Sequence, residues 1–99
     1  MNMNGGGSEI LLDARQMEPP EPFVAAMNIL RQLQAGKYLH MMHRRKPRLL
    51  YPELDAMGFT SHTVLDRDET YHILVWRDED IAASSAVDAC LDILAAISK

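Results

Sequence analysis

The chain has 99 residues, 47% of them hydrophobic and 24% charged, which is typical of a single globular domain. The formal net charge of −4 argues against a general nucleic-acid-binding protein, which would normally be basic. No apolar run approaches the roughly 18 residues that a membrane span needs, and a single cysteine, Cys90, excludes an internal disulfide. We therefore expect a cytoplasmic protein that makes no contact with a membrane.

The first half of the chain predicts a strand, a helix and a second strand. Residues 1–8 contain mainly Asn, Gly and Ser, which predicts a disordered tail, and residues 9–13 form a short apolar strand. Pro20 and Pro22 are expected in the first turn of a helix, where a missing N–H breaks no hydrogen bond. Apolar residues then recur at spacings of three and four, and Gly36 is predicted to end this helix. Residues 37–43 alternate between two faces, as a strand does.

The second half predicts a helix, a hairpin and a terminal helix. Pro47 opens a helical pattern that ends at Gly58, but Pro52 would interrupt it, so we expect either a late start near Tyr51 or a kink. Residues 60–65 and 71–77 are predicted strands around a polar turn and form an antiparallel hairpin. Residues 80–97 are rich in alanine and carry one apolar stripe, which predicts a helix.

This order of elements predicts a two-layer α/β (α+β) sandwich with a mixed four-stranded sheet and an extra C-terminal helix. Residues 1–8 would be the tail, residues 9–77 the domain and residues 78–99 the helical extension. The strand at residues 71–77 is apolar on both faces, so something must cover its second face. The terminal helix and a dimer partner are the alternatives, and we expect Trp76 to pack against the helix. The protein would then be a monomer or a weak dimer.

The first strand and the start of the helix after it carry a short motif. Leu12 and Asp13 are followed by Arg15, by the run Pro19-Pro20-Glu21-Pro22, and later by Pro47-Arg48. The motif and the order of elements resemble the TusA/SirA-like family of small sulfur carriers, most closely its uncharacterised bacterial branch. The resemblance spans roughly residues 10–77 and rests on the motif positions Asp13, Arg15, Pro19, Pro20, Pro22 and Pro47.

The resemblance also shows what this chain lacks. In the carriers a reactive cysteine stands at the start of the first helix, and Pro19 occupies that position here. Proline has no nucleophile, so sulfur transfer at the usual position is excluded, and we expect no catalytic residue and no cofactor. Cys90 is expected to be a buried structural cysteine, because Asp88 and Asp92 nearby would raise its pKa rather than lower it.

A basic cluster precedes the second predicted helix and is the strongest candidate for a ligand site. Arg44, Arg45, Lys46 and Arg48 follow the second strand, and Arg15 follows the first. The carboxyl ends of parallel strands meet at one edge of a sheet, so these side chains would converge on an anion or an acidic partner. The alternative is a solvated basic loop in which Arg15 simply pairs with Asp13 or Glu18.

The histidines predict polar packing rather than a metal site. His40 and His43 are three residues apart on a strand and point to opposite faces. His40, His62 and His72 would form a metal site if they shared the second sheet face, but no carboxylate spacing supports one. We therefore expect no bound metal.

The leading functional hypothesis is a non-enzymatic binding or adaptor module that kept the carrier scaffold and lost its thiol. The resemblance implies a protein partner, because the uncharacterised relatives often accompany metal and redox proteins of bacterial respiration or nitrogen-oxide metabolism, including hemerythrin-like domains. The alternative hypothesis is a small-anion or sulfur-species binding protein, or a transferase, that acts at the edge formed by Arg15 and residues 44–48.

Overall fold

The computed structural model describes residues 7–99, and these contain every predicted element in the predicted order. The elements are β1 (Glu9–Asp13), α1 (Glu21–Arg31), β2 (Tyr38–His43), α2 (Leu50–Met57), β3 (Phe59–Leu65), β4 (Tyr71–Arg77) and α3 (Ile81–Ala95). Most of the predicted tail lies outside the described residues, and the domain boundaries stay predictions. Within residues 7–99, no helix combines the length and apolar character that crossing a membrane requires.

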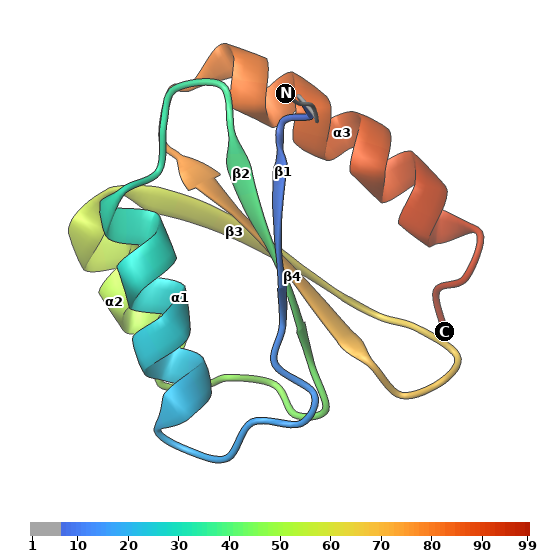
Figure 1. The fold of residues 1–99 in the computed structure, drawn as a ribbon. Coiled ribbons are helices and arrows are strands. Elements are labelled where there is room, and N and C mark those ends of the chain that lie inside the picture. Colours follow the sequence, from blue (N-terminus) through green and yellow to red (C-terminus); the bar gives the residue numbers. More distant parts are fainter. Residues whose placement is uncertain (1–6) are drawn as a thin grey trace.

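The strands form one mixed sheet in the order β1-β2-β4-β3 (Figure 1). β1 and β2 are parallel and are joined through α1, because a parallel pair needs a long crossover connection. β4 runs antiparallel to both β2 and β3. The predicted mixed four-stranded sheet and the predicted β3–β4 hairpin are therefore confirmed.

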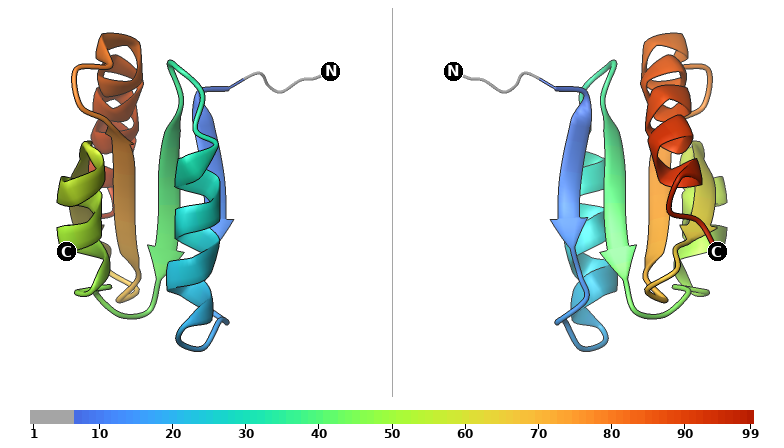
Figure 2. Two further views of the ribbon diagram at one scale, coloured as in Figure 1. Left: turned by 90° about the vertical axis from the view of Figure 1, so that its left-hand side faces the viewer. Right: turned by 90° about the vertical axis from the view of Figure 1, so that its right-hand side faces the viewer.

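α1 and α2 cover one face of the sheet, and the larger apolar core lies beneath them (Figure 2). Strand alternation sends Leu39 and Met41 of β2, and Ile73 and Val75 of β4, to this face, where none of them is exposed to solvent. The helices contribute Leu30 and other buried apolar residues to the same core. This layer of two helices on a sheet is the predicted sandwich.

α3 covers the opposite face of the same sheet, as the right-hand view of Figure 2 shows. Tyr38 and Leu74 from the sheet are buried there against Val87 and Leu94 of the helix, and Trp76 packs on this cluster. The terminal helix, the first of the two predicted alternatives, therefore packs on the second face. The predicted packing of Trp76 against it is confirmed.

Gly36 does not end α1, contrary to the sequence prediction. The helix ends at Arg31, and its C-cap residue is Gln32, which lies four residues before Gly36. Gly36 instead lies in the loop before β2 with a φ of 82°, a left-handed conformation that glycine adopts without strain. Its N–H donates to the Asp80 carboxylate at 2.9 Å, and Asp80 also caps α3. The left-handed conformation of Gly36 therefore allows the loop to make this contact with the start of α3.

α2 takes the late start that was one of the two predicted alternatives. It begins at Leu50 rather than at Pro47, so Pro52 is its third residue. N–H groups in a first turn have no acceptor within the helix, and a proline there breaks no bond. Gly58 ends the helix in a left-handed conformation, as predicted.

Tyr51→Phe should lower the free energy of unfolding by about 1 kcal/mol. The half-buried Tyr51 hydroxyl lies 2.6 Å from the hydroxyl of Thr63 and joins α2 to β3. Chemical denaturation would measure the loss. Tyr71→Phe is the matched control, because the Tyr71 hydroxyl makes no hydrogen bond within residues 7–99. Equal effects of the two variants would contradict a stabilising role for the Tyr51–Thr63 bond.

Candidate functional site

A groove of about 530 Å³ lies between the start of α1 and the loop that joins β2 to α2. All four prolines of the sequence motif line it, namely Pro19, Pro20, Pro22 and Pro47. Further apolar lining comes from Phe23, Met41, Leu49 and Leu50. Proline rings are rigid and carry no N–H, so this wall offers shape and apolar contact rather than hydrogen-bond donors.

The prolines stand at the start of α1 as predicted, except that Pro20 directly precedes the first turn rather than lying in it. Pro20 is the N-cap residue, Pro22 lies in the first turn and Pro19 directly precedes the cap. Pro20 and Pro22 remove two of the N–H groups that would otherwise bind an anion at a helix N-terminus. The start of α1 is therefore built for apolar contact.

Basic side chains gather along the α2 side of the groove. Arg45, Lys46 and Arg48 all line it, and none of the three forms an ion pair with another residue of the described range 7–99. Glu53 of α2 adds one carboxylate to the lining. The groove thus combines an apolar wall with three cations that have no carboxylate partner there.

His43, at the end of β2, holds the basic loop in place. Its Nδ1 accepts a hydrogen bond from the Arg45 backbone N–H at 3.0 Å. Burial lowers the pKa of His43, and the neighbouring charges of Arg44 and Arg45 act in the same direction. The ring therefore stays neutral near pH 7, and Nδ1 keeps the lone pair that this bond needs.

Two of the predicted site residues are not brought into the groove. The Arg15 guanidinium forms a two-pronged ion pair with Asp13, at 2.8 and 2.7 Å, as one sequence-based alternative anticipated. These hydrogen bonds and one from the Arg15 backbone lower the pKa of Asp13 to about 2. Arg44 lies 3.5 Å from Glu18. Among the predicted site residues, the groove therefore holds Arg45, Lys46 and Arg48.

A chain of hydrogen-bonded polar side chains crosses the other face of the sheet, beneath α3. His40 Nε2 and His72 Nδ1 are 2.8 Å apart, and both histidines are buried. At one end His72 Nε2 lies 2.8 Å from Asp66 Oδ2. At the other end His40 Nδ1 lies 3.0 Å from Glu9 Oε1. Two carboxylates are thus joined through two imidazole rings.

The Asp66 end of this polar chain determines which atom donates and which accepts in each of its hydrogen bonds. Burial opposes ionisation of Asp66, but hydrogen bonds from His72 and from the Thr70 and Asp68 N–H groups outweigh it and lower the pKa. An ionised carboxylate only accepts, so His72 Nε2 donates to Asp66. In a neutral His72, Nδ1 then accepts from His40 Nε2.

This arrangement leaves the chain one hydrogen short. Its three contacts need three hydrogens, whereas two neutral imidazole rings supply two. The lone pair of His40 Nδ1 would then face the Glu9 carboxylate at 3.0 Å. With both rings neutral, a cation between these two atoms, either a proton or a metal ion, would make this contact favourable.

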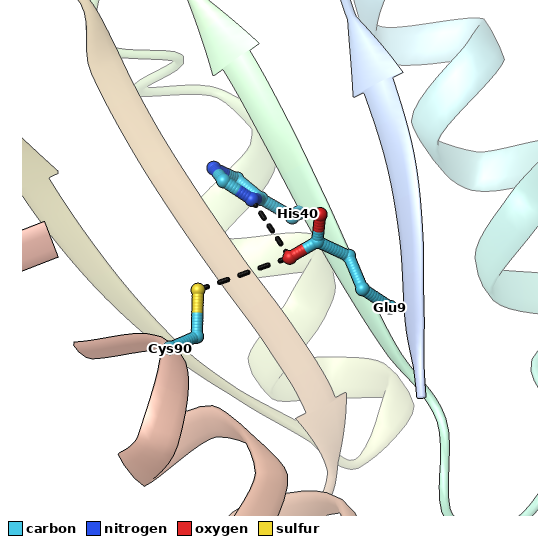
Figure 3. Close-up of side chains that lie close together, drawn as sticks. All are labelled: Glu9, His40 and Cys90. Atoms are coloured by element: carbon cyan, nitrogen blue, oxygen red, sulfur yellow. Dashed lines mark hydrogen bonds and ion pairs between the residues drawn. The ribbon is translucent and has the colours of Figure 1, made fainter. Parts of the chain in front are cut away.

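Cys90 of α3 approaches the same carboxylate (Figure 3). Its Sγ lies 3.8 Å from Glu9 Oε1, and the Tyr38 hydroxyl donates to that oxygen at 2.8 Å. Burial raises the pKa of Cys90, and the Glu9 charge adds to the rise. The predicted direction is confirmed, but Glu9 rather than Asp88 or Asp92 is the charge involved. The cysteine is half-buried, so it is less enclosed than we expected.

Residues 11–77 match the family described as uncharacterized conserved protein (DUF2249). The chain belongs to this family. The match ends with β4, so α3 lies outside the DUF2249 part of the chain, as do Glu9 and Cys90. The groove, by contrast, is lined only by matched residues. Comparison with curated proteins and with solved structures found no match.

The sequence of this DUF2249 protein indicated the histidines of the polar chain but not its carboxylates. His40 and His72 do share one sheet face, whereas His62 is exposed and is not part of the hydrogen-bonded polar chain. Glu9 was assigned only to a strand and Asp66 only to a turn. Alternation along β2 and β4 could reveal the histidine pair, but the contact with Cys90 depends on how α3 docks.

Proposed function

We propose that this DUF2249 domain is a non-enzymatic binding module that takes an acidic, partly apolar segment of a protein partner into the proline-lined groove. One observation carries the proposal: four motif prolines and three cations without carboxylate partners line the same groove. A segment that alternates acidic and apolar side chains would match both the apolar wall and the three basic side chains of the groove.

The groove favours a protein segment over a small anion. Leu49 lines it and is 83% exposed, and a small anion would leave this apolar surface uncovered. Pro20 and Pro22 supply no N–H donors, which are the groups that small oxyanions need at a helix N-terminus. Rigid proline rings also lose little conformational entropy on binding, which favours an extended partner segment.

The family resemblance supports a more specific form of the proposal. Pro19 stands where TusA/SirA-like carriers hold their reactive cysteine, so the groove would replace a thiol site on a related scaffold. In this account the protein is bacterial and cytoplasmic, acts as a monomer or a weak dimer, and binds a redox or metal protein. This partner class is supported by the metal and redox proteins that the uncharacterised relatives accompany, and not by the geometry of the groove.

A labelled peptide in which glutamates alternate with leucine and phenylalanine provides the test. We expect saturable binding by fluorescence anisotropy, and a variant that combines Arg45→Glu, Lys46→Glu and Arg48→Glu should bind at least about tenfold more weakly. The matched control is Arg67→Glu, an exposed arginine of the β3–β4 turn that does not line the groove. A peptide with lysine in place of glutamate should not bind.

Phosphate, sulfite and thiosulfate form the second arm of the same experiment. Displacement of the labelled peptide by millimolar concentrations of one of these anions would favour the alternative, a small-anion site. Equal peptide affinity for the wild type and the triple variant would contradict binding at this groove.

A further inference from the structure

The geometry points to a transition-metal site of the zinc class on the sheet face opposite the groove, formed by Glu9, His40 and Cys90. The three side chains come from β1, β2 and α3 and converge on one point (Figure 3). Their donor atoms, a carboxylate oxygen, an imidazole nitrogen and a thiol sulfur, all lie within 4.8 Å of one another. This donor set is one that Zn²⁺ takes in proteins.

The distances suit a four-coordinate ion. An ion about 2.1 Å from both His40 Nδ1 and Glu9 Oε1 would subtend an angle of about 90° across their 3.0 Å separation. With a Zn–S distance of about 2.3 Å, the 3.8 Å between Cys90 Sγ and Glu9 Oε1 gives an angle of about 120°. Both angles need only a small adjustment to become tetrahedral.

The polar chain behind His40 presents the correct ring nitrogen to the ion. Asp66 accepts from His72, and His72 Nδ1 in turn accepts from His40 Nε2, which leaves the lone pair of His40 Nδ1 facing Glu9. In metal-bound histidines the other ring N–H usually donates a hydrogen bond to a fixed acceptor in this way. The ion would also supply the cation that the chain lacks between His40 and Glu9.

Binding releases protons and leaves one coordination position free. The ion replaces the thiol proton of Cys90 and any proton shared by His40 and Glu9, and both protons pass to solvent. Three protein ligands leave a fourth position for water or a small ligand. The ion would tie α3 to β1 and β2. This site is separate from the groove, so either proposal can fail without the other.

Cobalt provides a spectroscopic test on the full chain without an affinity tag. We expect Co²⁺ to bind one ion per chain with a thiolate-to-cobalt charge-transfer band, and Zn²⁺ to displace it. Cys90→Ser should abolish this band. Cys90→Ser and Glu9→Gln should each weaken Co²⁺ binding at least about 100-fold, because loss of a direct ligand costs at least as much as loss of a residue that only orients one. The matched control is His62→Ala, an exposed histidine of β3, which should leave binding unchanged.

Three results would overturn the proposal. These are no Co²⁺ binding by the wild type at millimolar metal, a bound spectrum without the charge-transfer band, or equal affinity in the wild type and Cys90→Ser. A second readout needs no variant, because Zn²⁺ should slow alkylation of Cys90 by iodoacetamide at least about tenfold. Alkylation at the same rate with and without Zn²⁺ would also overturn it.

Discussion

Asp66→Ala should lower the free energy of unfolding by about 3 kcal/mol. The Asp66 carboxylate is buried and accepts three hydrogen bonds, from His72 Nε2 and from the Asp68 and Thr70 N–H groups. Alanine leaves the buried His72 ring without its acceptor and removes the partner of two N–H groups. Thermal unfolding should show a melting temperature at least about 10 °C lower.

Asp68→Ala is the matched control for this prediction. Asp68 lies in the same turn, is exposed, and its side chain accepts no hydrogen bond from another residue in the range 7–99. We expect a change within about 0.5 kcal/mol, as for ordinary surface substitutions. If Asp66→Ala were as mild as this control, the buried polar chain would not stabilise the fold.

The contribution of Asp66 should depend on pH in a defined direction. Its pKa in the folded protein lies below the ordinary value, so the folded state binds fewer protons than the unfolded state as the carboxyl titrates. The stabilisation is therefore fully present above the unfolded pKa of about 3.9 and is lost as the pH falls through the folded pKa. The difference in the free energy of unfolding between wild type and Asp66→Ala should become smaller below about pH 4. A difference that widens there would contradict this sign.

Val87→Asp should destabilise the protein by about 4 kcal/mol. Val87 is 1% exposed and packs with Tyr38, Leu74 and Leu94 between α3 and the sheet. Aspartate at this position would place a carboxylate in an apolar cluster, away from water. The protein avoids this desolvation cost only if α3 detaches from the sheet. Denaturation would measure the loss, and faster amide hydrogen exchange across α3 would identify the helix that detaches.

Ala89→Asp provides the control on the same helix. Ala89 is exposed, so the new carboxylate stays in water and only the lower helix propensity of aspartate is felt. Equal losses from the two variants would contradict the packing of α3 on its own sheet. That packing matters beyond stability, because it brings Cys90 to Glu9.

Much of the fold could be predicted because local residues dictate it. Pro52 limits α2 to a late start or a kink, Gly58 ends that helix, and the apolar and aromatic run at residues 71–77 predicts β4. Gly36 misled the prediction because a positive-φ glycine serves a loop as readily as a helix end. The prolines were predicted at the start of the first helix because a missing N–H breaks no bond there, and the structure confirms this placement.

The sites were harder to predict because they depend on contacts between distant parts of the chain. Cys90 and Glu9 are 81 residues apart and meet only through the docking of α3, which no local pattern encodes. The histidine pair depends on the β2–β4 register, in which Met42 faces His72 and His40 lies diagonally beside it. At the groove, the basic cluster was evident in the sequence, but the sequence could not decide whether Arg15 joins that cluster or pairs with Asp13.

Nuclear magnetic resonance mapping of the acidic, apolar probe peptide on the full chain is the most direct test of binding at the groove. We expect saturable shifts of the Phe23, Arg45 and Leu49 amides, with the amides of α3 unmoved. Shifts confined to α3, or no shifts at millimolar peptide, would contradict the account.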